Sequence, residues 1–116
     1  IPIDKSTDIT NYSLNQLWDE VKVGEAHKQR FNLCKPHLKK PAYTVVESTS
    51  NISSASIVHP TIKRKLNIEE VRMLCTFPKD YDFLNTNAIS TMGRSVLPVM
   101  MANIANQIKQ QWLDKI

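Results

Sequence analysis

The chain has 116 residues, 41% of them hydrophobic, and a formal net charge of +4. This length predicts one domain, and a content of only two glycines and six prolines argues against a flexible linker or a low-complexity chain. No apolar run approaches the roughly 18 residues that a membrane span needs, so no membrane association is expected. Two cysteines are too few for a disulfide framework, which favours a reducing, cytoplasmic setting.

A short helix is predicted near the beginning of the chain. Ser13 and Gln16 form a candidate capping box, in which side chains satisfy the free N–H groups of the first turn. The apolar residues that follow recur at helical spacing, at Leu14, Leu17, Trp18 and Val21. We therefore expect a helix over residues 14–21, which ends before Gly24.

The middle of the chain is expected to contain the strands. Residues 25–41 are interrupted by prolines and are interpreted as a loop, with 30–33 as a candidate short strand. Residues 42–47 are rich in β-branched and aromatic side chains and predict the best strand in the chain. The polar, unpatterned residues 48–56 are interpreted as a second loop.

Two helices are predicted in the second half. Asn67 stands at an N-cap position and two glutamates follow it in the first turn, which indicates a helix over residues 68–75. Residues 79–93 are interpreted as a loop. Pro98 suits the first turn of a final helix, because its missing N–H would be unpaired there. That helix carries one apolar stripe that must be buried: Met101, Ile104, Ala105, Ile108 and Trp112.

Positive charge is unevenly distributed along the chain. Lysines and arginines cluster in two places: Lys28, Arg30, Lys35, Lys39 and Lys40, and then Lys63, Arg64 and Lys65. Clustered cations bind DNA phosphates by releasing counterions, but solvated protein surfaces carry similar runs. Charge alone leaves both interpretations open.

The cysteines, histidines and methionines do not predict a site. Cys34-x-x-His37, with His27 and His59 elsewhere, lacks the second close pair of ligands that zinc sites have, so no metal is predicted. Cys75 lies in an apolar helix and is expected to be a buried thiol. Three methionines near the end of the chain are expected to belong to a core: Met92, Met100 and Met101.

Two motifs carry most of the functional information. The first runs from His59-Pro60 through Arg64 to Phe77-Pro78, in the pattern HP...R.L...E...L..FP. The second is Met92-Gly93-Arg94-Ser95-Val96-Leu97-Pro98. In this order and spacing, the pair resembles the last two motifs of DNA (cytosine-5) methyltransferases. The second motif departs from the family pattern Q.GN[SA]V.P, with Thr91 in place of Gln and Arg94 in place of Asn.

The resemblance implies a fold and a set of partners. Those enzymes flip a cytosine out of the duplex and methylate its C5 with S-adenosylmethionine, which is bound by a doubly wound α/β catalytic domain. We therefore expect an α+β fragment: a target-recognition region of short strands and helices over residues 1–85, then the final motif and last helix over 86–116. The last helix would pack on the catalytic domain. The expected partners are double-stranded DNA and an N-terminal catalytic domain or subunit.

The resemblance also assigns roles on the DNA side. Lys40-Pro41-Ala42-Tyr43-Thr44-Val45 matches the pattern KP..T[IL] of the recognition region, so Thr44 and Val45 would approach the DNA backbone beside the flipped cytosine. Phosphate contacts are expected from the basic clusters, at Lys39, Lys40, Lys63 and Lys65. Arg64 would have a structural role, bracing the recognition region through its five hydrogen-bond donors.

On the cofactor side, the resemblance points to the second motif. Gly93, Ser95 and Val96 would line the methionine and carboxylate end of S-adenosylmethionine, where a helix start offers free N–H groups. Arg94 could pair with that carboxylate or with a nearby acidic residue.

The reaction centre of the family has no counterpart in this sequence. No Pro-Cys dipeptide, no Glu-Asn-Val and no F.G.G loop occurs, so the isolated chain is expected to be inactive. The chain would then be a fragment of a bacterial restriction–modification enzyme or its natural small subunit, and both remain open. Without the catalytic domain, the stripe of the last helix is expected to lead to self-association or to repacking on residues 14–21.

Two other functions fit part of the pattern. A related enzyme that acts on transfer RNA shares the last two motifs, but its Cys-Phe-Thr element does not occur here. A non-catalytic DNA-binding module or specificity subunit would show DNA affinity without a catalytic partner. The DNA target sequence cannot be read, because specificity depends on a few loop side chains.

Overall fold

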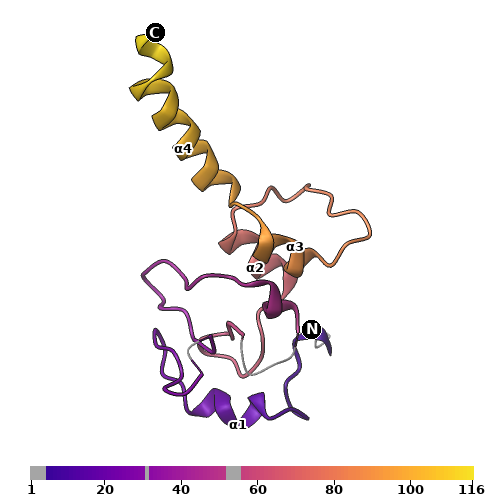
Figure 1. The fold of residues 1–116 in the computed structure, drawn as a ribbon. Coiled ribbons are helices and arrows are strands. Elements are labelled where there is room, and N and C mark those ends of the chain that lie inside the picture. Colours follow the sequence, from indigo (N-terminus) through magenta and orange to yellow (C-terminus); the bar gives the residue numbers. More distant parts are fainter. Residues whose placement is uncertain (1–4, 31, 52–55) are drawn as a thin grey trace.

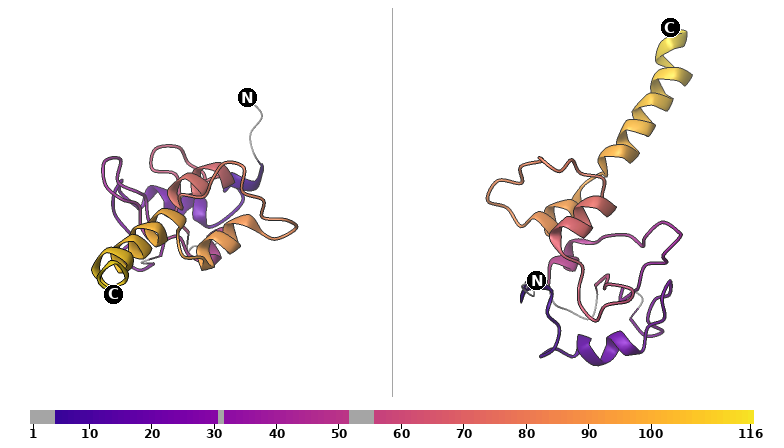
Figure 2. Two further views of the ribbon diagram at one scale, coloured as in Figure 1. Left: turned by 90° about the horizontal axis from the view of Figure 1, so that it is seen from above. Right: turned by 180° about the vertical axis from the view of Figure 1, so that it is seen from behind.

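The computed structural model describes residues 5–30, 32–51 and 56–116. In chain order it contains η1 (Lys5–Thr7), α1 (Leu14–Asp19), η2 (Glu47–Ser50), α2 (Ile68–Leu74), α3 (Ala88–Arg94), α4 (Pro98–Gln111) and η3 (Leu113–Lys115). Loops and short helices form a body, from which α4 projects with the C-terminus at its tip (Figure 1). The two further views in Figure 2 show the same separation, and the molecule extends 59 × 33 × 23 Å.

The expected strands are absent from the described residues. Pairing is limited to isolated bridges, which join Ala26 to Cys34, Cys34 to Ile57, and Val58 to Lys65. The strand expected over residues 42–47 was wrong, because 42–46 have no regular structure and η2 begins at Glu47. Strand propensity measures how well side chains fit a pleated surface, and no described segment pairs with these residues. The described part of the chain is therefore more helical than the α+β expectation.

Helix α1 lies where the apolar spacing predicted it, but its predicted cap was wrong. Ser13 has helical backbone angles, φ −56° and ψ −26°, and makes no side-chain capping bond. The apolar face of α1 covers a small core whose buried members are Ile9, Leu14, Val21, Leu33 and Val58. The backbone turn that precedes α1 already continues into the helix, so the side-chain cap is not needed.

Helix α2 begins as the sequence predicted. The Asn67 side chain accepts from the Glu70 N–H at 2.8 Å, and the Glu70 carboxylate accepts from the Asn67 N–H at 3.0 Å. This reciprocal pair is a capping box, which satisfies two otherwise free donors. The predicted N-cap is therefore confirmed, and the helix ends one residue earlier than expected.

Helix α3 lies in the segment that was expected to be a loop. The Asn87 side chain accepts from the Ser90 N–H at 3.2 Å and caps the helix. Ala88, Ile89 and Met92 face the larger core, and Met92 is fully buried. The loop expectation therefore holds for residues 79–87 and was wrong for 88–93, because an N-cap Asn and a three-residue apolar face are weak signals in a seven-residue helix.

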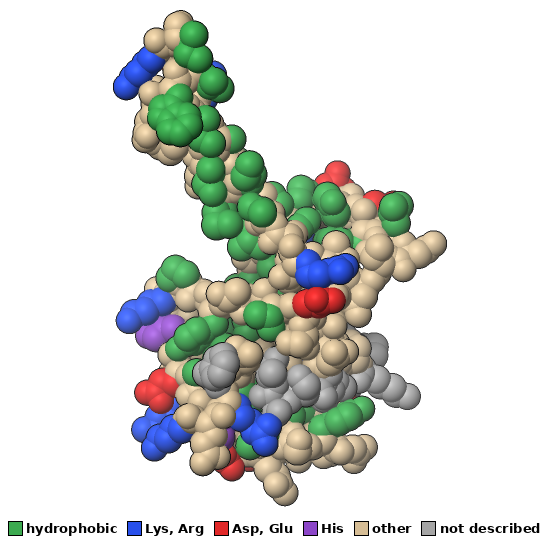
Figure 3. All heavy atoms as spheres, viewed as in Figure 1, with side chains coloured by type: hydrophobic (Ala, Val, Ile, Leu, Met, Phe, Trp, Pro, Cys, Tyr) green, Lys and Arg blue, Asp and Glu red, His purple; other side chains and the backbone are tan. Residues whose placement is uncertain are grey.

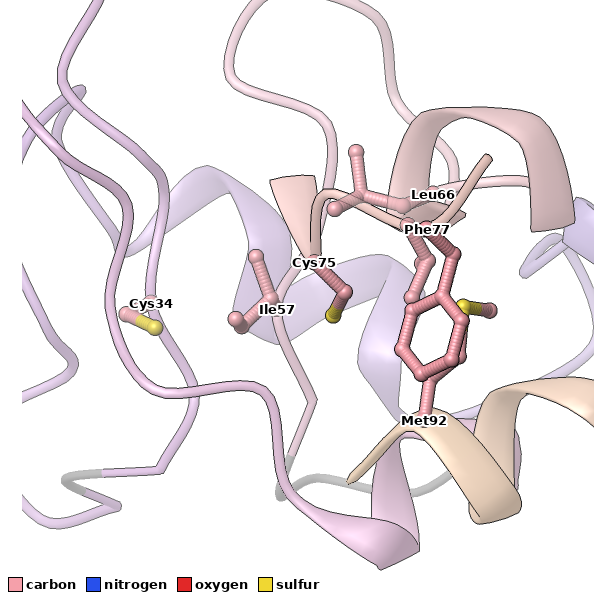
Figure 4. Packing of buried hydrophobic residues seen from close by; sticks show 7 residues of the cluster. Cys34, Ile57, Leu66, Cys75, Phe77 and Met92 are labelled. Carbon is pink, nitrogen blue, oxygen red and sulfur yellow. The ribbon is translucent and has the colours of Figure 1, made fainter. Parts of the chain in front are cut away.

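The larger core lies between α2, α3 and the bridged segments. Figure 4 shows Cys34, Ile57, Leu66, Cys75, Phe77 and Met92 within it. The first motif supplies several of these side chains, so the Phe-Pro end of that motif is packing that terminates α2. Phe77 also contacts Tyr81 and Phe83, with ring centroids 5.0 and 5.3 Å away.

Helix α4 begins at Pro98, as predicted, and is held to the body at its first turn. The Thr76 hydroxyl accepts from the Val99 N–H at 3.1 Å, although Thr76 itself has a positive φ of 62°. Beyond that turn, all residues from Val99 to Ile116 are exposed. Among the described helices, none has both the length and the apolar character needed to span a membrane.

Candidate functional site

The first motif opens with a tight turn built on His59. Its Nδ1 accepts from the Thr61 and Ile62 N–H groups at 3.2 and 2.9 Å, and its backbone N–H donates to the Arg64 carbonyl at 2.9 Å. Desolvation and the charge of Arg64 lower the pKa of His59, which keeps Nδ1 free to accept. The His-Pro pair therefore shapes the loop that presents the basic run.

Arg64 is engaged within the protein. Its guanidinium donates to both carboxylate oxygens of Glu70, at 2.9 and 2.7 Å, and to the Lys65 carbonyl at 2.8 Å. Because Glu70 also closes the capping box of α2, Arg64 ties the basic loop to the start of that helix. These contacts suit the structural role that the sequence suggested.

The two lysines of the run have different surroundings. Lys63 is partly exposed and forms an ion pair with Asp19 of α1. Lys65 is only 3% exposed, and its ammonium donates to the Thr49 and Asn51 carbonyls at 2.7 and 2.6 Å. A buried ammonium does not fit the expected phosphate contact, so Lys65 is left out of the candidate DNA surface.

One cavity brings together residues from the recognition segment and the second motif. This hollow of about 620 Å³, which we call the motif cavity, is lined by Thr44, Val45, Gly93 and Ser95, with Lys40 at its edge. Thr44 is exposed, whereas Val45 packs partly into the larger core. The two segments that the sequence assigned to DNA and to the cofactor therefore share one space.

Lys39 and Lys40 are exposed beside a further hollow. The segment before them and the His-Pro turn together line a space of about 340 Å³, to which His37, Leu38, His59 and Pro60 contribute. The Lys39 N–H donates to His37 Nδ1 at 3.0 Å, which fixes the direction of the chain there. The segment carrying Lys39 and Lys40 and the turn that leads into Lys63 are therefore neighbours on the surface.

Gly93 is needed because another segment lies against it. A Cβ at this position would stand 2.5 Å from the Val46 carbonyl carbon and 2.6 Å from the Glu47 nitrogen. No side chain fits there, so this glycine brings α3 directly onto the backbone at the start of η2. Sequence reasoning assigned Gly93 to the cofactor and missed this packing role.

The rest of the second motif forms a turn between α3 and α4. The Ser95 hydroxyl donates to the Met92 carbonyl at 2.7 Å, and Val96 is 59% exposed. Arg94 pairs with a nearby acidic residue, Glu47, at 3.9 Å. For S-adenosylmethionine, this turn therefore offers a hydroxyl oxygen that can still accept and an exposed apolar side chain, which fits contact with one edge of the cofactor.

The thiols and histidines do not form a reactive centre. Burial raises the pKa of Cys34 to about 11 and also raises the pKa of Cys75, so both remain protonated at neutral pH. His27 Nε2 lies 2.6 Å from the Glu20 carboxylate, which occupies it as a structural pair. In the described part of the chain, no group of three or more His, Cys, Asp and Glu could hold a metal ion.

Sequence reasoning also missed the environment of Lys35. This residue is buried, and its ammonium lies 3.2 Å from the centroid of the Trp18 ring, a cation–π contact. The Trp18 indole N–H donates to the His59 carbonyl at 3.0 Å. Trp18 thus supports the first motif from α1, and no sequence signal could have shown this, because 41 residues separate the two.

A continuous apolar surface runs along α4. Figure 3 shows hydrophobic side chains along the length of this helix, and a groove of about 830 Å³ beside them is lined by Leu97, Met100, Ile104, Ile108 and Trp112. Trp112 is 70% exposed. Met92 belongs to the core as expected, but the expectation for Met100 and Met101 was wrong, since both are about half exposed. The apolar stripe that the helical spacing predicted is present but exposed, and it does not repack on residues 14–21.

Comparisons with known proteins agree with these motifs. Residues 3–110 match a family model described as C-5 cytosine-specific DNA methylase. A protein of Methanocaldococcus jannaschii that is provisionally named a type II methyltransferase is 30% identical over 124 residues, which cover 93% of this chain and 38% of the relative. The chain thus spans less than half the length of this curated relative, and no solved structure matches it. The chain belongs to the C-5 cytosine-specific DNA methylase family.

Proposed function

We propose that this chain is the C-terminal part of a DNA (cytosine-5) methyltransferase, with target recognition over residues 1–85 and the final motif and last helix over 86–116. The observation that carries the proposal is the motif cavity, where Thr44 and Val45 lie beside Gly93 and Ser95. In such an enzyme the DNA strand and the methyl donor must meet at one place, and this cavity joins the segments assigned to each.

The DNA side of the proposal depends on exposed cations and a hydroxyl. Lys40 lines the cavity and Lys39 precedes it in the chain; both are exposed and carry no ion pair among the described contacts, while Thr44 offers a hydroxyl that can donate to a phosphate oxygen. Lys63 adds a third cation, which would have to break its ion pair with Asp19 or keep it while contacting a phosphate. These groups position a duplex without reading its sequence, so binding should be strongly salt-dependent.

This chain would contact only one edge of S-adenosylmethionine. When bound, S-adenosylmethionine supplies the methyl group that is transferred to C5 of the flipped cytosine. Ser95 would accept a hydrogen bond at this edge and Val96 would cover apolar atoms, whereas Gly93 acts by holding α3 against η2. The nucleophile and the acid would come from the catalytic part of the enzyme.

The stripe on α4 would dock on that catalytic part. Ile104 and Ile108 are 44% and 42% exposed, and an apolar surface of this length on a single helix is normally covered by a partner. Burial of the area still exposed would contribute about 1 kcal/mol for each large side chain. A second copy of the chain is the alternative occupant, and sedimentation tests it.

Binding of duplex DNA by charge-changed variants tests the DNA role. Lys39→Glu with Lys40→Glu should weaken binding and lower the slope of log affinity against log salt by about 2, roughly 0.9 for each phosphate that is no longer neutralised. Lys109→Glu in the last turn of α4 with Lys115→Glu in η3 makes the same change in net charge near the C-terminus, which lies far from the body in Figure 1, and is the control. Equal effects of the two pairs on the slope would show that binding responds to net charge alone and would reject the proposed surface.

A further inference from the structure

The short helix η2 follows the recognition segment in the chain and contacts the second motif. It begins at Glu47, directly after the segment that contains Thr44 and Val45, and its start lies against Gly93 of α3. The Ser90 hydroxyl donates to the Glu47 carboxylate at 3.2 Å, and Arg94 lies 3.9 Å from the same carboxylate. A shift of η2 would therefore move the recognition segment relative to the second motif.

Lys65 holds the opposite end of η2. Its ammonium reaches across from the first motif and donates to the carbonyls of Thr49 and Asn51, which mark the end of the helix. Among the described residues, the buried Thr49 hydroxyl has no hydrogen-bond partner, so the Thr49 side chain does not anchor that end of η2. A buried ammonium is costly to desolvate, and two carbonyl acceptors offset that cost only while η2 stays in place.

The ammonium group of Lys65 is charged at neutral pH, as a donor to two carbonyls must be. Desolvation lowers the pKa of Lys65 to about 8, so the group keeps its proton at neutral pH and can donate to both carbonyls. The neighbouring Lys63, which is partly exposed and paired with Asp19, makes no such contact and serves as a natural comparison.

We propose that Lys65 is a positioning residue that acts through η2, fixing Thr44 and Val45 relative to the turn formed by Gly93 and Ser95. What the two sides bind rests on the proposed function, but the mechanical coupling does not. Lys65 thereby links the first motif, the recognition segment and the second motif, which are far apart in the sequence. Its contribution is to hold the DNA side and the cofactor side of the cavity in a fixed position relative to each other.

Amide hydrogen exchange of the full chain tests the coupling. Lys65→Met removes the donors but keeps the length of the side chain, and it should speed exchange in η2 and in α3 by about tenfold or more, as expected when two hydrogen bonds are removed. Lys63→Met removes the neighbouring charge and should leave both helices unchanged. Val71→Ala, on the buried face of α2 in the larger core, is the control for a general loss of stability.

The pattern of exchange decides between positioning and plain stabilisation. If Lys65→Met speeds amide exchange in η2 and α3 well beyond the effect of Val71→Ala, with the two variants compared at equal global stability, the positioning role is supported. If the two variants give the same pattern, or if Lys65→Met affects η2 but leaves α3 unchanged, the proposal is overturned. Should the Met variant fail to fold, Lys65→Gln keeps one donor, and the same local pattern is expected.

A second measurement adds a mixed-sequence DNA duplex at low salt. At saturating duplex, amide exchange should slow in η2 and also in α3 in the unaltered chain and in Lys22→Met, an exposed lysine outside the candidate DNA surface, whereas in Lys65→Met it should slow in η2 only. Equal slowing of α3 in Lys65→Met would contradict the coupling. If the duplex does not bind the unaltered chain, the proposed DNA role fails, while the first measurement still decides the positioning role.

Discussion

Glu70 accepts hydrogen bonds from two parts of the chain at once. Its carboxylate closes the capping box with Asn67 and receives the guanidinium fork of Arg64, so one side chain fixes both the start of α2 and the basic loop. These bonds, first of all those from Arg64, hold the pKa of Glu70 below its usual value of 4.5. Protonation of Glu70 in acid should therefore destabilise the folded chain.

We expect the contribution of Glu70 to depend on pH. Because its pKa is lower in the folded state, the unfolded chain takes up the proton first as the pH falls, so the stabilisation is complete above pH 4.5 and is lost below it. Glu70→Gln should cost about 1–3 kcal/mol at neutral pH, and the difference from the unaltered chain should shrink on acidification. Urea unfolding at several pH values measures this. Glu69→Gln, at an exposed ion pair, is the control, and a cost independent of pH would refute the assignment.

Gly93→Ala separates helix propensity from packing. In an exposed helix this change should stabilise by up to about 1 kcal/mol. Here the new Cβ would meet the backbone of Val46 and Glu47 at 2.5–2.6 Å, so we expect a loss of about 1–3 kcal/mol instead. Thermal unfolding measures the sign, with Thr91→Ala on the same helix as the control. A stabilised Gly93→Ala variant would mean that η2 does not lie against α3.

The helices η2 and α4 differ in how firmly they are held to the body. η2 is held by contacts on both sides, from Lys65 and from α3. α4 is held at its first turn by the Thr76 hydroxyl and then leaves the body with its stripe uncovered (Figure 1). A helix in that position gains most of its stability only when its apolar face is covered.

We expect the isolated chain to self-associate through α4. Ile104→Asp with Ile108→Lys should convert it to a monomer while circular dichroism stays unchanged, because these side chains are about half exposed and support no core. Asn106→Asp with Gln110→Lys places the same charges on residues outside the stripe and should leave association intact. Sedimentation velocity measures both. If the first variant unfolds, the stripe is internal core and not a docking surface.

At the scale of the whole molecule, the groups that surround the motif cavity can bind and position but not react. The described thiols are buried and protonated, and the exposed groups near the cavity are lysines and hydroxyls. Positioning by itself supplies no nucleophile, so under the proposed function the family's missing elements would come from another segment or subunit.

The isolated chain is therefore expected to transfer no methyl group from S-adenosylmethionine to DNA. Incorporation of radiolabel should equal that of a sample without protein. If label is incorporated above that background and is lost in Cys34→Ser or Cys75→Ser, one of these thiols is a nucleophile and the interpretation of the chain as a recognition part is wrong.

Features that depend on near neighbours in the chain could be predicted from the sequence. The N-cap at Asn67, the helix start at Pro98 and the stripe from Met101 to Trp112 follow from local patterns and helical spacing, which hold wherever the helix packs. The two motifs indicated the family for the same reason, since each is a short local pattern that can be recognised in the sequence alone.

Features that depend on distant segments arise only in the folded chain. Residues 42–47 have strand-forming side chains but no described partner to pair with, Lys65 is buried because η2 and its C-cap offer it two carbonyls, and Gly93 is required because Val46 and Glu47 lie against it. For Lys65 and Gly93, the deciding contact joins residues more than a dozen positions apart. Charge, propensity and spacing describe one residue or one helix at a time, and burial is a property of the assembled chain.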